Sequence, residues 1–414
     1  MGPRSARRSG RAFTLRGAVV VEFESVELRD VHVVDGRIAS EPGAGRLTID
    51  LTGHVVYPGL VNAHDHLQLN SVPRMPLEAP VANSYQWIEH WSSHLDDPEI
   101  RRAREIPTAI RHWQGALKNL LCGTTTVSHH DPWQPVFDDT WFPVNVPRCG
   151  WCHSLRLGRP ADKDPYPRYG PDVCECFRET GCDVPWIIHL AEGIDAEAEG
   201  ELSRLKEMGC LAKHTVIVHG VGLSVADIEE VIAAGAAVVW CPASNLNILG
   251  RTLDPARLAS SNRLALGTDS RISGASDLLA EVKVARATTG LNAQSLFSMI
   301  TSTAAAILDV EGAGTLTIGA RADMVILRDG GGDPFTQLLE SERSEIRAVV
   351  RAGLPAVIDP DLAGWLSAAG IDSAEMELDG VAKLIDRRLL GPAGAAEIEP
   401  GLKLSWSGSP EQIQ

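Results

Sequence analysis

The sequence lacks a hydrophobic run long enough to cross a bilayer, which excludes an integral membrane protein built on helices. It also lacks a surplus of positive charge. Lys and Arg number 38 against 54 Asp and Glu, and the resulting net charge of -16 repels nucleic acids and other polyanions. We therefore expect a small, neutral or cationic substrate, and neither a nucleic acid nor a membrane as partner.

A secretory signal is also missing, because no clear hydrophobic segment and cleavage site follow the basic start Met1–Arg16. We expect residues 1–16 to form a disordered leader. Eight cysteines then indicate reduced thiols in the cytoplasm. The run Cys149-Gly150-Trp151-Cys152-His153 spells a c-type haem attachment motif, but such attachment requires export. Buried free thiols are favoured over a structural zinc shared with Cys174, Cys176 and Cys182.

The 414 residues predict one large domain and one smaller domain. Short β-rich runs with tight turns occupy residues 18–56 and return over 314–327 and 346–357. We expect a small β-sandwich built from both chain ends, residues 17–57 and 309–358. A C-terminal extension, 359–414, follows, with one helical stretch around residues 373–390.

Residues 58–308 show a different sequence pattern, in which short apolar runs typical of strands alternate with segments typical of helices. Repeated strand-helix units predict parallel strands with right-handed crossovers. The expected fold class is therefore α/β, with a (β/α)8 barrel of the triosephosphate-isomerase type whose active site lies where the strands end. Seven strands can be identified. An irregular unit is expected at residues 159–183, which are rich in Pro, Asp, Tyr and Cys.

His64-Asp65-His66 stands at the end of the apolar run 55–61. Residues i and i+2 of a strand project to the same face, so a strand ending here would aim both imidazoles at one point. Taken alone, the pair is equally well explained as two structural histidines at a strand end. Other strand ends make the metal interpretation stronger.

Three further predicted strands end in a residue that can bind a metal, and these residues are His189, His219 and Asp269. Glu192 follows His189 by three residues. Imidazole nitrogens and a carboxylate suit a divalent ion, and we expect one zinc, with iron as the alternative. Such an ion lowers the pKa of bound water. Glu192 would carry that water's proton to the leaving nitrogen. His219 would orient the hydroxide or polarise the carbonyl or imine of the substrate, and Asp269 would share in the proton transfer.

Six ordered motifs resemble the amidohydrolase superfamily, in its cytosine, guanine and adenosylhomocysteine deaminase and chlorotriazine hydrolase branch. They are Pro58-Gly59-Leu60-Val61-Asn62-Ala63-His64-Asp65-His66, Gly123-Thr124-Thr125-Thr126, His189-Leu190-Ala191-Glu192, Cys241-Pro242-Ala243-Ser244-Asn245, Gly267-Thr268-Asp269, and Gly314-Thr315-Leu316 with residues 320–325. The resemblance implies a metal held by His64, His66, His189 and Asp269, with Glu192 and His219 as catalytic groups. Binuclear relatives use a lysine that the run 149–157 lacks, so a single metal is expected. We also expect a homodimer or higher homo-oligomer.

Substrate contacts are expected in the loops that follow the strands. Trp87 and Trp91 offer flat walls for a heterocycle, although residues at i and i+4 of a helix also pack against each other. His129 follows the second strand, and His153 and Arg156 follow the middle strand. Arg156 would bind a carboxylate or carbonyl, or would form a structural ion pair instead.

Three functions remain open. The first is hydrolytic deamination of a nitrogen-rich heterocycle, which Glu192 favours because a carboxylate there can protonate a ring nitrogen. The second is hydrolysis of a cyclic amide, or of another C–N or a C–Cl bond, by the same water. The third is a catalytically inactive binding protein.

Overall fold

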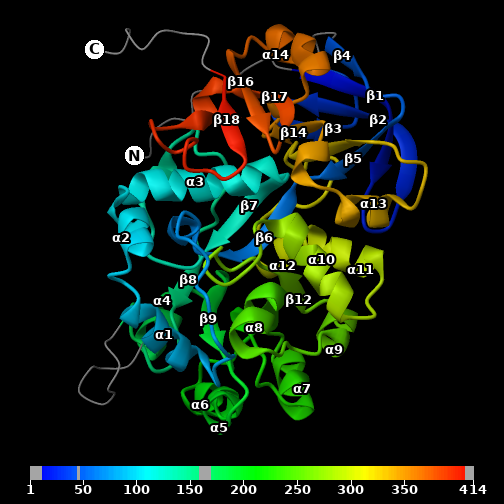
Figure 1. Ribbon diagram of the computed structural model, residues 1–414. Helices are drawn as coiled ribbons and strands as arrows, with labels where there is room; N and C mark the ends of the chain where they lie inside the picture. The colour runs from blue at the N-terminus through cyan, green and yellow to red at the C-terminus, as the bar shows by residue number, and fades with distance from the viewer. Residues whose placement is uncertain (1–11, 44–46, 158–168, 406–414) are drawn as a thin grey trace.

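The computed structural model describes residues 12–43, 47–157 and 169–405, and these ranges form two regions (Figure 1). One is a large mixed β-sheet, and the other is a set of parallel strands surrounded by helices. Residues 1–11 of the predicted leader and 159–168 of the predicted irregular unit lie outside the described residues, as do residues 406–414 of the predicted extension.

The mixed sheet contains eleven strands in the order β18-β16-β17-β15-β14-β13-β5-β1-β2-β3, with β4 paired to β1. The strands are β1 (Ala12–Val21), β2 (Val26–Val34), β3 (Arg37–Ala39), β4 (Leu47–Asp50), β5 (His54–Pro58), β13 (Met324–Arg328), β14 (Ala348–Arg351), β15 (Leu354–Ile358), β16 (Ser373–Leu378), β17 (Val381–Asp386) and β18 (Leu402–Leu404). Strands from both ends of the chain thus share one sheet, which begins inside the predicted leader and continues into the predicted extension.

Hydrophobic alternation explains this sheet. In β1 the buried side chains Phe13 and Leu15 are separated by the half-buried Thr14, as expected for a strand with one face on a core. Gly17, at φ 73°, sits where the pairing of β1 with β2 shifts register between Leu15 and Ala18. Glycine is suited to this bulge because it adopts positive φ without steric cost.

The predicted helical stretch at residues 373–390 is wrong over β16 and β17, which form an antiparallel hairpin. Ala374, Met376 and Leu378 are buried and alternate with the less buried Glu375 and Glu377. This period of two is the pattern of a strand and not of a helix.

The second region carries the site. Its parallel strands are β6 (Leu60–Asp65) paired with β7 (Thr124–His129), and a five-stranded sheet of β8 (Gly150–Cys152), β9 (Trp186–Leu190), β10 (Thr215–His219), β11 (Ala237–Trp240) and β12 (Leu264–Leu266). Nearly every residue of these strands is buried, as expected where helices cover a parallel sheet. The predicted α/β class with parallel strands is confirmed.

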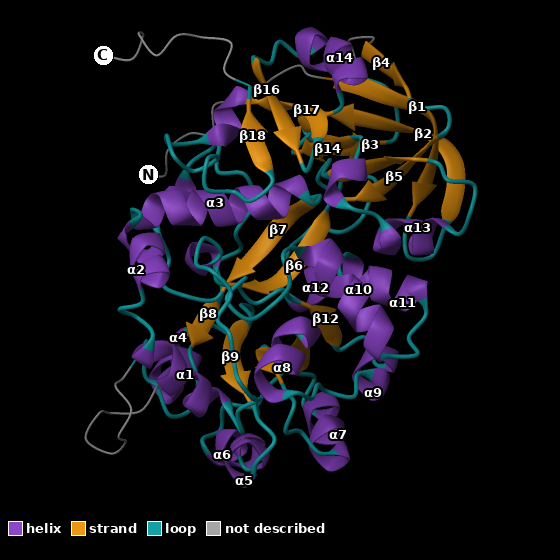
Figure 2. Cartoon of the chain, in the orientation of Figure 1, coloured by secondary structure: helices purple, strands orange, loops and turns teal. Residues whose placement is uncertain are grey.

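Helices flank these strands, and Figure 2 separates the two types of element by colour. They are η1 (Leu67–Leu69), α1 (Ser84–Ser93), α2 (Pro98–Glu105), α3 (Thr108–Leu121), η2 (Pro135–Asp138), α4 (Val173–Glu179), α5 (Ala196–Glu199), α6 (Glu201–Glu207), α7 (Val225–Ala233), α8 (Pro242–Leu249), α9 (Ala256–Ser260), α10 (Leu278–Thr288), α11 (Ala293–Met299) and α12 (Ser302–Ile307). Beside the mixed sheet lie α13 (Pro334–Glu340), η3 (Arg343–Glu345), η4 (Pro360–Leu362), α14 (Ala363–Ala368) and η5 (Arg387–Leu390). Over the described ranges, none of these helices has the length and hydrophobicity needed to span a bilayer.

Candidate metal centre and active site

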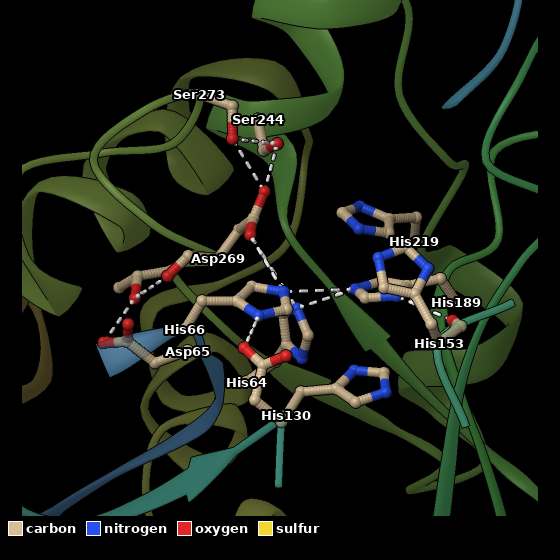
Figure 3. A network of polar contacts seen from close by, with 12 residues as sticks. His64, Asp65, His66, His130, His153, His189, His219, Ser244, Asp269 and Ser273 are labelled. Atoms are coloured by element: carbon tan, nitrogen blue, oxygen red, sulfur yellow. Dashed lines mark hydrogen bonds and ion pairs between the residues drawn. The ribbon is translucent and has the colours of Figure 1, made fainter. Parts of the chain in front are cut away.

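Polar side chains gather at the carboxyl ends of the parallel strands (Figure 3). His64 lies in β6 with His66 just beyond its end, His189 lies in β9, His219 ends β10, and Asp269 follows β12. Since neighbouring strands run in the same direction, their carboxyl ends meet at one edge. The fold therefore brings these five residues together from distant parts of the sequence.

Four of them have the mutual spacing of ligands around one ion. His189 Nε2 lies 3.3 Å from His64 Nε2 and 3.4 Å from His66 Nε2. Asp269 Oδ1 lies 3.6 Å from His66 Nε2 and 3.9 Å from His64 Nε2. Donors at about 2.0–2.2 Å from one tetrahedral zinc ion are about 3.3–3.6 Å apart, and three of these four separations lie in that range while the fourth is slightly longer. The residues present therefore fit a divalent ion.

Hydrogen bonds orient two of these imidazoles. His66 Nδ1 donates to Asp131 Oδ2 at 2.8 Å, and His189 Nδ1 donates to the backbone carbonyl of His153 at 2.8 Å. Each bond leaves the lone pair on Nε2, the atom that faces the other donors. The tautomer needed for metal binding is thus set by the surrounding protein.

The electrostatics of these imidazoles differ. Burial lowers the pKa of His64 and of His189 well below the usual range of histidine, and neighbouring imidazoles lower it further, so both rings are neutral. His66 is also buried, but the charge of Asp131 and its hydrogen bond outweigh burial and raise the pKa of His66 to about 9. Neutral imidazole is the form that binds a metal, so His66 would release its second proton when an ion binds to Nε2.

Asp269 is held by two hydroxyl groups. Ser244 Oγ and Ser273 Oγ each lie 2.7 Å from Asp269 Oδ2, which leaves Oδ1 toward the imidazoles. Ser244 belongs to the Cys241–Asn245 motif at the start of α8. This motif thus has a local role that the sequence did not reveal.

Three residues of the site have a strained backbone conformation. Ala191, His219 and Asp269 have φ of 53°, 73° and 53°, in the left-handed region that residues other than glycine rarely occupy. All three stand at or just after the end of a parallel strand. Such strain persists only where the surrounding structure holds it, and it is common at functional sites.

Glu192 and His219 form a second pair beside the four donors. Glu192 Oε1 lies 3.5 Å from His219 Nε2, while His219 Nδ1 donates to Asn245 Oδ1 at 2.8 Å. Burial raises the pKa of Glu192 above its usual range, although the neighbouring His219 opposes the shift. A carboxyl group of raised pKa is suited to accept and return a proton near neutral pH.

A fifth buried imidazole of the site, His130, was missed as a site residue from the sequence. His64, His66, His130 and His189 each offer a ligand atom, and these atoms lie within 4.8 Å of one another. The ring of His130 stacks on that of His189 at 4.2 Å, and its Nε2 lies 3.0 Å from the carbonyl oxygen of Cys152. His130 is one residue beyond β7, so the strand-end pattern that found the other histidines could have found it.

Asp65 points away from the imidazoles, as alternation along a strand requires. Its carboxylate is fully buried and lies 3.0 Å from Lys118 Nζ of α3. Asn70 Nδ2 and Asn119 Nδ2 also donate to it, at 2.7 and 2.8 Å. A buried charge that is paired and fully hydrogen-bonded anchors the backbone between His64 and His66.

A cavity of about 400 Å³ opens onto the site. Its lining includes His66, His189, Glu192, His219 and Asp269, together with the predicted contacts Trp87, Trp91 and His153 and with Tyr169, Asp131 and Arg104. The four candidate ligands and the Glu192–His219 pair thus lie at or beside a space of the size that small-molecule sites occupy.

Two of the predicted contacts lie elsewhere in the described structure. His129 packs against His112 and Phe137, with ring centroids 5.2 and 5.0 Å away. The guanidinium of Arg156 lies 5.0 Å over the ring of Tyr85. Neither residue lines the cavity as described, and their contact with substrate stays a prediction.

The cysteines are all unpaired. Within the described ranges, one group of three or more His, Cys, Asp or Glu has a spacing suited to an ion, and its members are His64, His66, His130 and His189. No cysteine belongs to this group.

Residues 182–365 match the model of the amidohydrolase family. The chain is 27% identical over 367 residues to a 5-methylthioadenosine/S-adenosylhomocysteine deaminase of Syntrophobacter fumaroxidans, covering 72% of this chain and 79% of that protein. The predicted resemblance to the amidohydrolases is confirmed.

Two solved structures of zinc-containing enzymes have a similar fold. An adenosine deaminase from Xanthomonas campestris with bound zinc superposes with a TM-score of 0.65 at 21% identity, covering 86% of this chain and 97% of that chain. The atrazine chlorohydrolase from Arthrobacter aurescens in complex with zinc gives a TM-score of 0.66 at 21% identity, covering 83% and 94%.

Proposed function

We propose that this chain is a metal-dependent hydrolase that releases ammonia from a nitrogen-rich heterocycle by attack of water. The observation that carries the proposal is the meeting of four donors with a proton-carrying pair. His64, His66, His189 and Asp269 have the spacing of ligands to one ion, and Glu192 with His219 lies beside them on the cavity. The deaminase named above, similar over most of this chain, supports the same chemistry.

A single zinc ion is the cofactor we propose, with iron as the alternative. Three imidazoles and one carboxylate suit either metal, and zinc is bound in both structures of similar fold. The run Cys149–Leu157 contains no lysine to bridge a second metal. When bound, the ion lowers the pKa of a water molecule and so supplies a nucleophile near neutral pH.

Glu192 and His219 would manage the protons. Glu192 takes a proton from the attacking water and delivers it to a ring nitrogen or to the departing ammonia, for which its raised pKa is suited. His219, fixed by Asn245, orients the water through Nε2. Asp269 Oδ1 shares in the proton transfer while it serves as a ligand.

We also propose that the parallel strands close into one (β/α)8-type barrel. Asp269 N donates to the carbonyl of His64 at 3.1 Å, which links the end of β12 to β6. Asn145 N donates to the carbonyl of Thr125 at 2.8 Å, which links β7 to the segment before β8. The likeness of fold to the two zinc-containing structures supports this arrangement. The domain division at residues 58 and 309 belongs to the same proposal.

The alternative reaction is displacement of another leaving group, such as chloride or an amide nitrogen, by the same water. The similar fold of the atrazine chlorohydrolase is compatible with it. The raised pKa of Glu192 favours deamination, since ammonia leaves only after protonation whereas chloride leaves without it.

Release of ammonia from a compound library tests the proposal. The zinc-loaded protein is incubated with adenine nucleosides, aminopyrimidines, aminopurines, pterins and aminotriazines, and chloride release from chlorotriazines is measured in parallel. His66→Ala is the control for contaminating activity. Ammonia release by the wild type alone is the expected result. Chloride release without ammonia favours the alternative, and a fully negative screen with full metal content contradicts deamination.

The cellular setting stays a proposal as well. Eight unpaired thiols fit the cytoplasm, where cysteines remain reduced. The small-molecule substrate is supported by the cavity, and the homo-oligomeric state stays a prediction.

A further inference from the structure

Glu201, the first residue of α6, is buried with 3% of its surface exposed, and it does not line the cavity as described. Its two carboxyl oxygens contact two different elements of the active site. Oε2 accepts the backbone N–H of Ala191 at 2.6 Å, and Oε1 accepts the hydroxyl of Tyr85 at 2.5 Å. A buried carboxyl shared in this way is costly to maintain unless both hydrogen bonds are kept.

The first contact holds a strained residue. Ala191 has a φ of 53°, and it separates the candidate ligand His189 from Glu192 by a sharp change of chain direction. Its carbonyl accepts the N–H of Gly222 at 2.8 Å, so the peptide groups on both sides of Ala191 are fixed. An alanine leaves the left-handed region once its supporting contacts are lost, because that region is unfavourable for residues with a Cβ. Glu192 would then turn away from His219.

The second contact holds a wall of the cavity. Tyr85 belongs to α1, which also carries the cavity-lining Ser84 and Trp87. Ser84 N donates to the carbonyl of Glu192 at 2.9 Å, so this hydrogen bond already joins the start of α1 to the Glu192 loop. Glu201 joins the same two segments through its contacts with Ala191 and Tyr85.

We propose that Glu201 is a positioning residue that fixes Glu192 and the α1 wall of the cavity in one arrangement. It acts through Ala191 and Tyr85 and does not touch the substrate. The inference rests on the proposed function, because it assumes that Glu192 carries the proton.

The test is Glu201→Gln, which keeps the size of the side chain but presents an N–H group to one of two donors. Glu207→Gln is the matched control, since Glu207 lies on the same helix and is exposed. We expect Glu201→Gln to keep one metal per chain, to lower kcat about 10- to 100-fold and to change KM much less. The control should stay within about twofold of the wild type.

Hydrogen exchange gives a readout that does not need the substrate. In Glu201→Gln, amides of residues 190–194 should exchange faster, while those of the strands β10 and β11 should keep the wild-type rate. A kcat equal to that of Glu207→Gln, or exchange at residues 190–194 equal to the wild type, would overturn the proposal. Exchange that rises equally across the chain would also overturn it, because it would show general destabilisation.

Tyr85→Phe is the second variant and serves if Glu201→Gln does not fold. It removes one hydroxyl and leaves the carboxyl on Ala191, so KM should rise more than kcat falls. A KM and a kcat equal to those of the wild type would contradict the proposed coupling between Glu201 and α1. If the wild type releases no ammonia from any compound, the deaminase proposal fails, whereas the exchange result still decides whether Glu201 holds Ala191.

Discussion

His66 Nδ1 lies 2.8 Å from Asp131 Oδ2, so a carboxylate that is not a candidate ligand sets which nitrogen of His66 faces the site. The other oxygen of Asp131 accepts the hydroxyl of Tyr169 at 2.6 Å. Asp131 is thus held between a candidate metal ligand and a residue of the cavity wall.

Asp131→Asn should weaken zinc binding about 10- to 100-fold, because the amide is neutral and no longer favours the Nδ1–H tautomer of His66 as strongly. Competition with a chromophoric chelator measures the affinity. Asp138→Asn is the control, since Asp138 is an exposed residue paired with Arg148. Equal affinities in the two variants would show that Asp131 does not orient the ligand.

Glu192→Gln should keep the metal and lose turnover by about 100- to 10,000-fold, since the amide fills the same space but cannot carry a proton. Elemental analysis gives the metal content, and ammonia release gives the rate. Loss of metal from this variant would instead make Glu192 a ligand and would change the donor set proposed above.

The strand ends made most of this site predictable. His64, His66, His189, His219 and Asp269 come directly from the rule that parallel strands deliver their last residues to one edge. Lys118, Tyr85 and Glu201 could not be found in the same way. They reach the site sideways from helices, and such contacts depend on how each helix packs rather than on a local pattern. The sequence analysis chose His129 as a residue of the site, whereas the structure places its neighbour His130 among the imidazoles. The end of a strand is uncertain by one or two residues when it is read from sequence.

The mixed sheet was harder to predict. Residues 17–57 and 309–358 were expected to combine, and their strands do share one sheet. The participation of β16 and β17 was missed because charged residues such as Glu375 and Lys383 weaken the apparent alternation. Lys383 is in fact buried, and its ammonium group donates to the carbonyl of Ile346 at 2.7 Å.

Stability should depend on pH through Glu201. Burial raises the pKa of Glu201 from 4.5 to about 7. Because the folded chain holds this proton more tightly, the contribution of Glu201 to stability is complete below about pH 4.5 and is lost as the pH rises through about 7, amounting to about 3 kcal/mol. The stability difference between Glu201→Gln and the wild type should therefore shift in favour of the variant as the pH rises from about 5 to about 8, whatever the variant loses in hydrogen bonding at both pH values.

The urea midpoints of the wild type and of Glu201→Gln, measured at about pH 5 and about pH 8, give this difference in stability. The titration of all groups that the two proteins share cancels in the comparison. A difference that stays constant between the two pH values would show that Glu201 has an ordinary pKa. Glu207→Gln should show no such change, since Glu207 is exposed.

Glu399 connects the C-terminal segment to the loop after Asp269. Its carboxylate is fully buried, Arg271 donates to it with both terminal nitrogens at 2.8 Å, and Arg343 donates to it at 2.6 Å. Glu399→Ala should destabilise the protein by about 3 kcal/mol, because the guanidinium of Arg271 would lose its paired charge while remaining largely buried.

The urea midpoint tests this expectation against Glu377→Ala, which removes a more exposed pair with Lys403 and should cost about 1 kcal/mol or less. Similar losses in the two variants would mean that Glu399 makes no special contribution. Arg271 is two residues from Asp269, so a lower zinc affinity in Glu399→Ala would show that the C-terminal segment also supports the metal centre.

The pairing of β5 with β13 and of β15 with β17 has a consequence for biosynthesis. The early strands β1 to β5 leave the ribosome long before their partners exist, and the whole parallel region is made in between. During that interval the edge of β5 is open to other chains, as unpaired strands are. A chain stopped before β13 should therefore aggregate or recruit chaperones, even where its catalytic region is complete.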